Sequence, residues 1–127
     1  MNHMVSLEEV EIMLNEMAAL FPQEIYKELN GGIVLLPDVK LNNLAKKNDL
    51  YIMGEYHGGG NMGRYIIIYY GSFMKVYGYM EKEQLRERLL HTLKHEFTHH
   101  LESLAGEKDL EIKDANYIRD YLKRRDR

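Results

Sequence analysis

The residues best suited to chemistry stand together in the sequence His95-Glu96-Phe97-Thr98-His99-His100. On an α-helix, residues four positions apart share a face, so the imidazole nitrogens of His95 and His99 can bind one Zn²⁺ ion. Glu96 follows the first histidine, and from there its carboxylate can reach a water on the open coordination position of the ion. This HExxH spacing is typical of zinc-dependent hydrolysis, in which the glutamate serves as general base and is not a ligand.

The motif can work only on a helix, and the surrounding sequence favours one. No Gly or Pro occurs from residue 81 to residue 105, and Gly106 stands where the helix should end. On a helical wheel, His91, His99 and Glu102 all lie within about 40° of His95. The opposite face is apolar and carries Leu90, Leu93, Phe97, Leu101 and Leu104. We therefore expect one long helix with a buried apolar face and an outward row of histidines, although a helix with merely solvated histidines would show the same two faces.

Length and composition limit the class of protein. The 127 residues fit a single domain, residues 1–127, which is too short for two large lobes around a deep cleft. The formal charge of −3, from 17 basic and 20 acidic residues, gives no general attraction for nucleic acid or an anionic membrane. Because cysteine is absent, a metal must be bound by histidines and carboxylates. No stretch has the length of a membrane span and the first residues do not resemble a signal peptide, so we expect a cytoplasmic protein.

The rest of the sequence predicts an α+β fold, with helices packed on a small twisted mixed sheet of three to four strands. Ser6 and Glu9 form a capping box for a first helix over about residues 7–20, and Pro22 begins a second, shorter helix. Asp114 can cap a last helix, which ends in a basic cluster at residues 123–125. The segments with strand character are residues 33–36, 50–56, 64–70 and 73–77.

With this motif, this order of elements and this size, the chain resembles the small bacterial zincin-like metallopeptidases, or minimal zincins. The likeness rests on a first helix ending in Leu20-Phe21-Pro22, on the strands at 33–36 and 50–56, and on the helix with the HExxHH signature. It implies a zinc-dependent peptidase with one Zn²⁺ per chain. The family pattern, HExxHxxGxxD, supplies its aspartate as third zinc ligand, but here Glu102 holds the glycine position and Ala105 the aspartate position.

Two residues can replace the missing ligand. Glu102 lies one turn beyond His99 on the metal face, and Asp109 belongs to a later Gly-x-x-Asp sequence that begins at Gly106. We favour Glu102, because helical side chains lean toward the helix N-terminus and its carboxylate is thereby directed to the space above His99. Asp109 would have to return to the metal through a loop.

The leading hypothesis is hydrolysis of peptide bonds by Zn²⁺ on His95, His99 and a carboxylate, with Glu96 as general base on the zinc-bound water. The alternative is a non-catalytic zinc-binding or protein-interaction module with the same fold. Glu96 favours the catalytic version, because a glutamate that is not a ligand has a role only there.

A peptidase also needs a donor for the oxyanion and a surface for its substrate. His57, Tyr56 and Arg64 flank a glycine-rich segment and are the candidate donors. By resemblance to zincins, an extended peptide or protein substrate would pair with a strand edge beside the metal, formed by residues 64–70 or 73–77.

Overall fold

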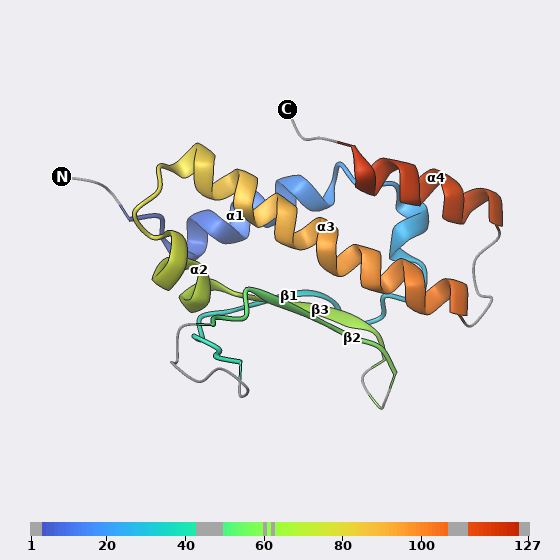
Figure 1. Ribbon diagram of the computed structural model, residues 1–127, viewed down its shortest axis with the longest axis horizontal. Helices are drawn as coiled ribbons and strands as arrows, with labels where there is room; N and C mark the ends of the chain where they lie inside the picture. The colour runs from blue at the N-terminus through green and yellow to red at the C-terminus, as the bar shows by residue number, and fades with distance from the viewer. Residues whose placement is uncertain (1–3, 43–49, 60, 62, 107–111, 125–127) are drawn as a thin grey trace.

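The computed structural model describes residues 4–42, 50–59, 61, 63–106 and 112–124. Within these residues the chain forms four α-helices, one short 3-10 helix and a three-stranded sheet (Figure 1). In chain order the elements are α1 (Leu7–Ala18), η1 (Gln23–Tyr26), β1 (Gly32–Leu36), β2 (Gly54–His57), β3 (Tyr65–Tyr69), α2 (Tyr70–Tyr77), α3 (Lys82–Gly106) and α4 (Ile112–Lys123). The predicted α+β class is confirmed.

The sheet is mixed and has the strand order β1-β3-β2. β1 runs parallel to β3 with Val34 opposite Ile67, and β2 runs antiparallel to β3 with Tyr56 opposite Ile66. β3 is therefore the central strand, and β1 and β2 are the edges of the sheet. The prediction that residues 64–70 form a substrate-binding edge is wrong, because both sides of β3 are already paired.

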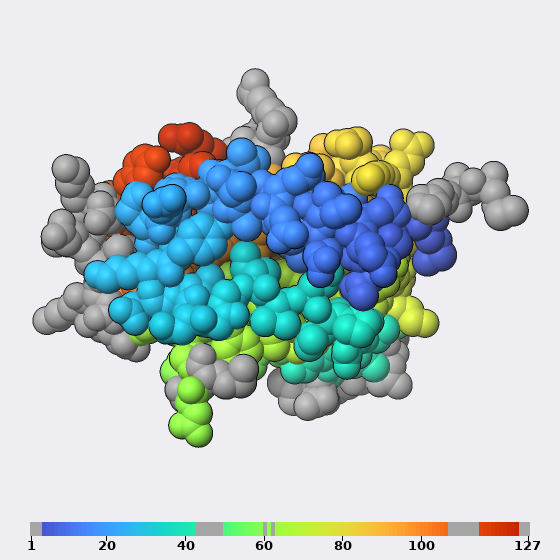
Figure 2. All heavy atoms as spheres, turned by 180° about the vertical axis from the view of Figure 1, so that it is seen from behind, coloured from blue at the N-terminus to red at the C-terminus, as the bar shows by residue number. Residues whose placement is uncertain are grey.

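The helices cover one face of the sheet. α1, α3 and α4 all lie on the same side of it (Figure 1), and seen from behind, the blue to cyan segment from α1 to β1 runs across the middle of the molecule (Figure 2). α3 contributes the largest buried row to the core, and its buried apolar side chains are Leu85, Leu89, Leu93, Phe97, Leu101 and Leu104. The apolar face expected for this helix is confirmed, and the burial of these side chains fixes which face of α3 remains open to solvent.

Residues 73–77, predicted as a strand, belong instead to the helix α2, which follows β3 without an intervening loop. Gly71 and Ser72, which separate two segments of strand character in the sequence, form part of the first turn of this helix. A Cβ at Gly71 would lie 2.7 Å from the backbone of Pro37 and Asp38, and the Ser72 hydroxyl accepts a hydrogen bond from the Lys40 amide at 2.9 Å. These contacts with a distant segment stabilise a helix that the local sequence does not specify.

Other boundaries differ by smaller amounts. Of the predicted strand at 50–56, only the end pairs with β3, and β2 extends one residue further to His57, while Tyr51 makes a single bridge with Leu41. The predicted second helix is the short η1, with Ile25 buried. Asp114 lies inside α4, which begins at Ile112, so it does not occupy the predicted cap position. Within the described residues, no helix combines the length and apolar character needed to cross a membrane.

Candidate metal centre

His95 and His99 lie on the exposed face of α3, one turn apart, with their imidazole rings in contact. Their Nε2 atoms are 3.2 Å apart, and the ring planes are nearly perpendicular, at 89°. Two nitrogens bound to zinc at about 2.0–2.1 Å in a tetrahedral arrangement are separated by about 3.3 Å. The spacing of the two Nε2 atoms therefore fits a shared Zn²⁺ ion. A hydrogen bond between two neutral rings, one donating and one accepting, also fits this distance.

Glu96 is buried although it follows an exposed histidine, with 5% of its surface exposed. Burial raises the pKa of its carboxyl above the usual range, and the negative charge of Glu55 adds to the increase. The imidazoles of His99 and His57 act in the opposite direction. A carboxylate with a raised pKa holds a transferred proton more firmly, which suits a general base.

A groove of about 640 Å³ runs between α3 and the edge strand β2 and contains the motif. One wall is β2, from Gly54 to His57, and the other is formed by His95, Glu96, His99, Glu102 and Ser103 of α3. The two elements approach closely because position 54 has no side chain. A Cβ there would lie 3.0 Å from Cγ2 of Thr92 and 3.2 Å from the carbonyl oxygen of Ile67.

Glu102, the favoured third ligand, contacts the other nitrogen of His99. Its Oε1 lies 3.2 Å from Nδ1, on the side of the ring opposite the Nε2 atom that faces His95. A carboxylate on Nδ1 is the usual outer partner of a zinc-binding histidine, where it fixes the tautomer so that Nε2 carries the lone pair. As a ligand, Glu102 would have to turn away from Nδ1.

Among the described residues, no third histidine, aspartate or glutamate joins His95 and His99 in a complete metal-binding group. Asp109, the other candidate, lies outside the residues that the structure describes. The assignment of the third ligand therefore remains a prediction from the sequence.

His100, to which the sequence pattern assigned no role, is fully buried. Its Nε2 donates to the carbonyl of Lys27 at 2.9 Å, so its Nδ1 is the acceptor for the Tyr56 hydroxyl at 2.8 Å. Burial lowers the pKa of His100, which keeps the ring in this neutral state. The helical wheel contains the signal for this role, since His100 falls about 140° from His95, next to the apolar face.

The three candidate oxyanion donors differ in their surroundings. Tyr56 and His57 both line the groove, but the Tyr56 hydroxyl is bound to His100. Arg64 is buried, and its Nε donates to Ser103 Oγ at 3.2 Å. The His57 ring stacks on Tyr65 with a centroid distance of 4.8 Å and an interplanar angle of 7°. The structure therefore places Tyr56 and His57 in the groove that contains the motif, and Arg64 is not among the residues that line this groove.

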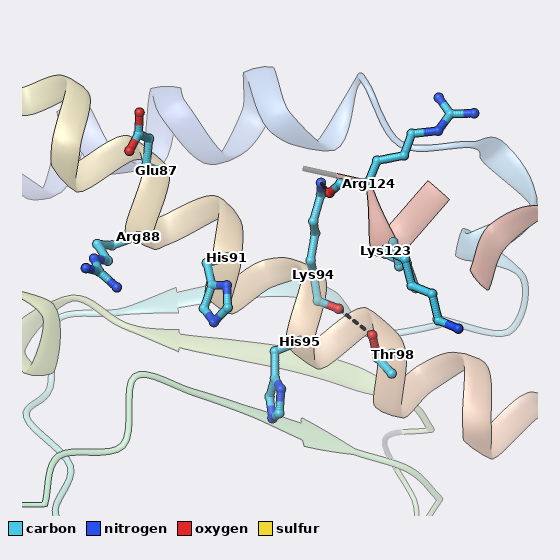
Figure 3. Close-up of a pocket in the computed structure, with 9 residues that line it drawn as sticks. Glu87, Arg88, His91, Lys94, His95, Thr98, Lys123 and Arg124 are labelled. Atoms are coloured by element: carbon cyan, nitrogen blue, oxygen red, sulfur yellow. Dashed lines mark hydrogen bonds between the residues drawn. The ribbon is translucent and has the colours of Figure 1, made fainter. Parts of the chain in front are cut away.

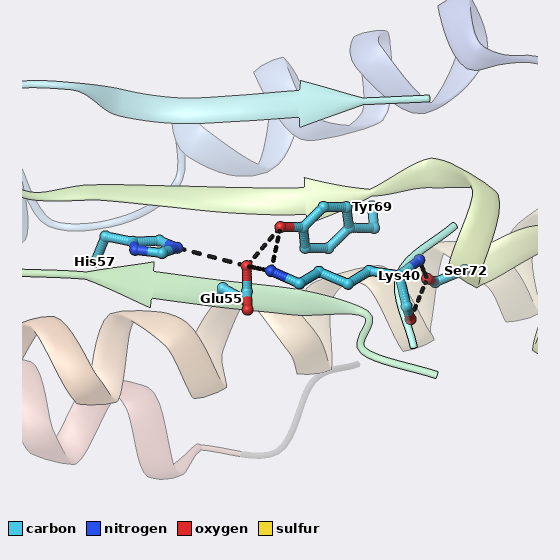
Figure 4. Close-up of polar contacts among 5 residues, drawn as sticks. All are labelled: Lys40, Glu55, His57, Tyr69 and Ser72. Atoms are coloured by element: carbon cyan, nitrogen blue, oxygen red, sulfur yellow. Dashed lines mark hydrogen bonds and ion pairs between the residues drawn. The ribbon is translucent and has the colours of Figure 1, made fainter. Parts of the chain in front are cut away.

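A polar cluster on the outer face of the sheet orients His57 (Figure 4). Glu55 is its centre, since Oε1 accepts from Lys40 Nζ at 2.9 Å and from the Tyr69 hydroxyl, and lies 3.4 Å from His57 Nε2. Burial alone would raise the pKa of Glu55, but the hydrogen bonds from Tyr69, Lys40 and His57 outweigh it and lower the pKa. No signal in the sequence predicts this cluster, because Lys40 and Tyr69 approach Glu55 only through the fold.

Comparison with known proteins adds a fold relative. Neither the models of known protein families nor the curated proteins give a match. Among solved structures, the chain is similar to a conserved hypothetical protein from Thermus thermophilus, with 28% sequence identity and a TM-score of 0.71. The match covers 80% of this chain and 99% of that one, so the α+β architecture extends over nearly the whole of that protein.

Proposed function

We propose that this protein is a zinc-dependent metallopeptidase that hydrolyses peptide bonds. The observation that supports it most is the convergence of His95 and His99, with Nε2 atoms 3.2 Å apart, in the same groove as the buried Glu96. A metal-binding histidine pair needs no glutamate at this position, whereas a hydrolase needs a base there.

The residues of the groove divide the work of hydrolysis. His95 and His99 would hold the zinc through Nε2, and Glu102, at Nδ1 of His99, would keep that ring in the required tautomer. Zinc in this position supplies a Lewis acid for the substrate carbonyl and lowers the pKa of water. Glu96 accepts the proton of the attacking water and transfers it to the leaving amine. His57 is the donor that we assign to the developing oxyanion, through Nδ1–H of its imidazolium form, because its Nε2–H is directed to Glu55.

The substrate surface that we assign is the outer edge of β2, in place of the two segments expected from the sequence. β2 forms one wall of the groove and, among the described residues, pairs with β3 on its inner side only. The Tyr69 amide donates to the carbonyl of Met53 at 2.9 Å, so Met53 and Tyr69 are a hydrogen-bonded pair. Because such pairs alternate along an antiparallel ladder, the N–H and C=O of Glu55 point toward β3 and those of Gly54 point outward. An extended peptide added at this edge would lie beside His95 and His99.

The test is the variant Glu96→Gln, assayed with the zinc-loaded chain on a library of unstructured peptides. We expect this variant to bind zinc and unfold as the parent does, and to hydrolyse peptides at least about a hundredfold more slowly. Glu83→Gln is the matched control, because it makes the same chemical change at an exposed position in the first turn of α3.

Unchanged turnover in Glu96→Gln would refute the assigned base. Stoichiometric zinc binding in a parent that cleaves no peptide in the library would instead favour the alternative function, a non-catalytic zinc-binding or protein-interaction module.

A further inference from the structure

A second groove lies on the other flank of α3, against the end of α4 (Figure 3). Its volume is about 630 Å³, and cationic side chains dominate its walls. These are Arg88 and Lys94 from α3 and Lys123 and Arg124 from the end of α4, with Glu87 the one carboxylate among the described lining residues. Four cations against one carboxylate form a local positive field in a chain whose formal charge is −3. We call this feature the cationic groove.

The cations of this groove differ from other cations on the same helix. Lys82 and Arg86 point toward α1 and form ion pairs with Glu9 at 3.4 Å and Glu16 at 3.0 Å. In the part of the chain that the structure describes, no carboxylate pairs with Arg88, Lys123 or Arg124. Within the described residues, the charges of Arg88, Lys123 and Arg124 are therefore not neutralised by an ion pair.

Aromatic rings and a carbonyl hold the side chains in place instead. The Arg88 guanidinium lies 5.3 Å from the Tyr77 ring centroid, and that of Arg124 lies 5.5 Å from the Tyr121 ring. Lys94 Nζ donates to the carbonyl of Arg124 at 3.1 Å, which fastens the end of α4 to α3. Contact with a ring face orders a cation without cancelling its charge, so Arg88 and Arg124 remain able to bind an anion.

The cationic groove adjoins the metal centre, because His95 lines both. A peptide bound along β2 that also crosses His95 would therefore come within reach of the positive field. We propose that the cationic groove is a substrate subsite that binds carboxylates, either acidic side chains or the terminal carboxylate of a peptide. This inference rests on the proposed peptidase function and names the chemical class of its substrate. A nucleic acid suits the groove less well, because a long polyanion would be repelled by the acidic remainder of the surface.

The experiment measures binding, so it does not depend on turnover. The zinc-loaded Glu96→Gln chain is titrated with fluorescein-labelled peptides. Apart from two adjacent glutamates, placed before or after the middle of the peptide, their sequences are uncharged. Matched peptides carry glutamines instead, and each is made with a free and an amidated C-terminus. The variant Arg88→Gln/Lys123→Gln removes one cation from each wall of the groove. The control Lys75→Gln/Arg119→Gln removes equal charge at exposed positions outside it.

We expect the glutamate peptides to bind about tenfold more tightly than their glutamine counterparts at low salt, and the advantage to shrink as salt rises. Arg88→Gln/Lys123→Gln should abolish most of this advantage, and the control should retain it. If affinity falls only when the C-terminus of the peptide is amidated, the terminal carboxylate is the group that the groove recognises. Equal binding of all peptides, equal losses in both double variants, or tighter binding of an equally charged DNA oligonucleotide would overturn the proposal.

The two proposals can fail separately. Cleavage of peptides without preference for acidic ones would refute the subsite and leave the peptidase assignment intact. Binding of acidic peptides that depends on Arg88 and Lys123, in a parent that hydrolyses none, would refute the peptidase assignment and support the carboxylate site.

Discussion

His99 and His100 are neighbours on α3, and the structure gives them opposite environments. The side chain of His99 is 48% exposed, and its Nε2 faces another imidazole nitrogen. His100 is completely buried, with one nitrogen donating to Lys27 and the other accepting from Tyr56. Both nitrogens of His100 are held by groups inside the protein, whereas the Nε2 atoms of His95 and His99 face each other at exposed positions, where a shared metal could replace their contact. The comparison supports a structural role for His100 and leaves the outer pair for the proposed metal.

The largest effect should come from the outer pair. His95→Ala or His99→Ala removes one of the two nitrogens that converge on the proposed zinc site, so we expect each variant to lose zinc binding. Metal analysis of protein equilibrated with one equivalent of zinc and then gel-filtered is the measurement. His91→Ala, an exposed histidine one turn earlier on α3, is the matched control and should bind as much zinc as the parent. Equal zinc in all the variants would remove the basis for a metal centre.

His100→Ala should affect folding and not the metal directly. It leaves a cavity, and it strips hydrogen bonds from the Lys27 carbonyl and the Tyr56 hydroxyl, so we expect a loss of about 2–4 kcal/mol in the free energy of unfolding. Urea denaturation of the zinc-free protein measures this loss. His91→Ala should change the same quantity by less than about 0.5 kcal/mol. If both substitutions lower the free energy of unfolding equally, the structural role assigned to the buried His100 is wrong.

A smaller effect should separate the roles of Glu102 and Asp109. We expect Glu102→Ala to weaken zinc binding by about tenfold, measured by competition with a chelator. Glu102→Gln is the informative variant, because an amide oxygen still accepts from His99 Nδ1 but is a poor substitute for a carboxylate ligand. Near-parent affinity in Glu102→Gln indicates the outer role, and a loss as large as that of Glu102→Ala indicates direct ligation. A larger loss in Asp109→Ala would identify Asp109 as the third ligand.

The smallest effect should come from the partly exposed Glu55. Because its folded pKa is lowered, Glu55 stabilises the protein above its unfolded pKa of about 4.3, and this contribution disappears as the pH falls through the folded value. Glu55→Gln should therefore lower the free energy of unfolding by less than about 1 kcal/mol at pH 7. The difference in unfolding free energy between parent and variant should narrow below about pH 4. Unfolding free energies of parent and variant over this range provide the check. A difference that grows on acidification would contradict the assigned sign.

The predictions succeeded where local sequence determines structure. The motif helix was predicted within one residue of its observed ends, because an uninterrupted run of helix formers ends at a glycine. They failed at residues 73–77, where Gly71 and Ser72 resemble a turn and only the contact with residues 37–40 reveals a helix. The order of strands in the sheet was likewise hidden, since pairing of β1 with β3 depends on long-range contacts.

The site shows the same division. The helical period was sufficient to bring His95 and His99 to one face, because both residues belong to one element. The opposing wall could not be predicted, since β2 reaches α3 through the absence of a side chain at Gly54 and through the Tyr56 bond to His100. The position of the Glu102 carboxylate depends on a rotamer, which the spacing of residues does not specify.

The central position of α3 has a consequence for how zinc is gained and lost. This helix packs against α1, α4, η1, β2 and β3, so its middle turns cannot fray independently of the domain. Amide protons from His95 to Leu101 should therefore exchange with deuterium only through near-global opening. Because both imidazoles belong to one turn of a helix that the core holds in place, little of the zinc affinity would be lost to ordering the chain. Zinc would then leave by exchange of its ligands in the native state, at a rate independent of the unfolding rate.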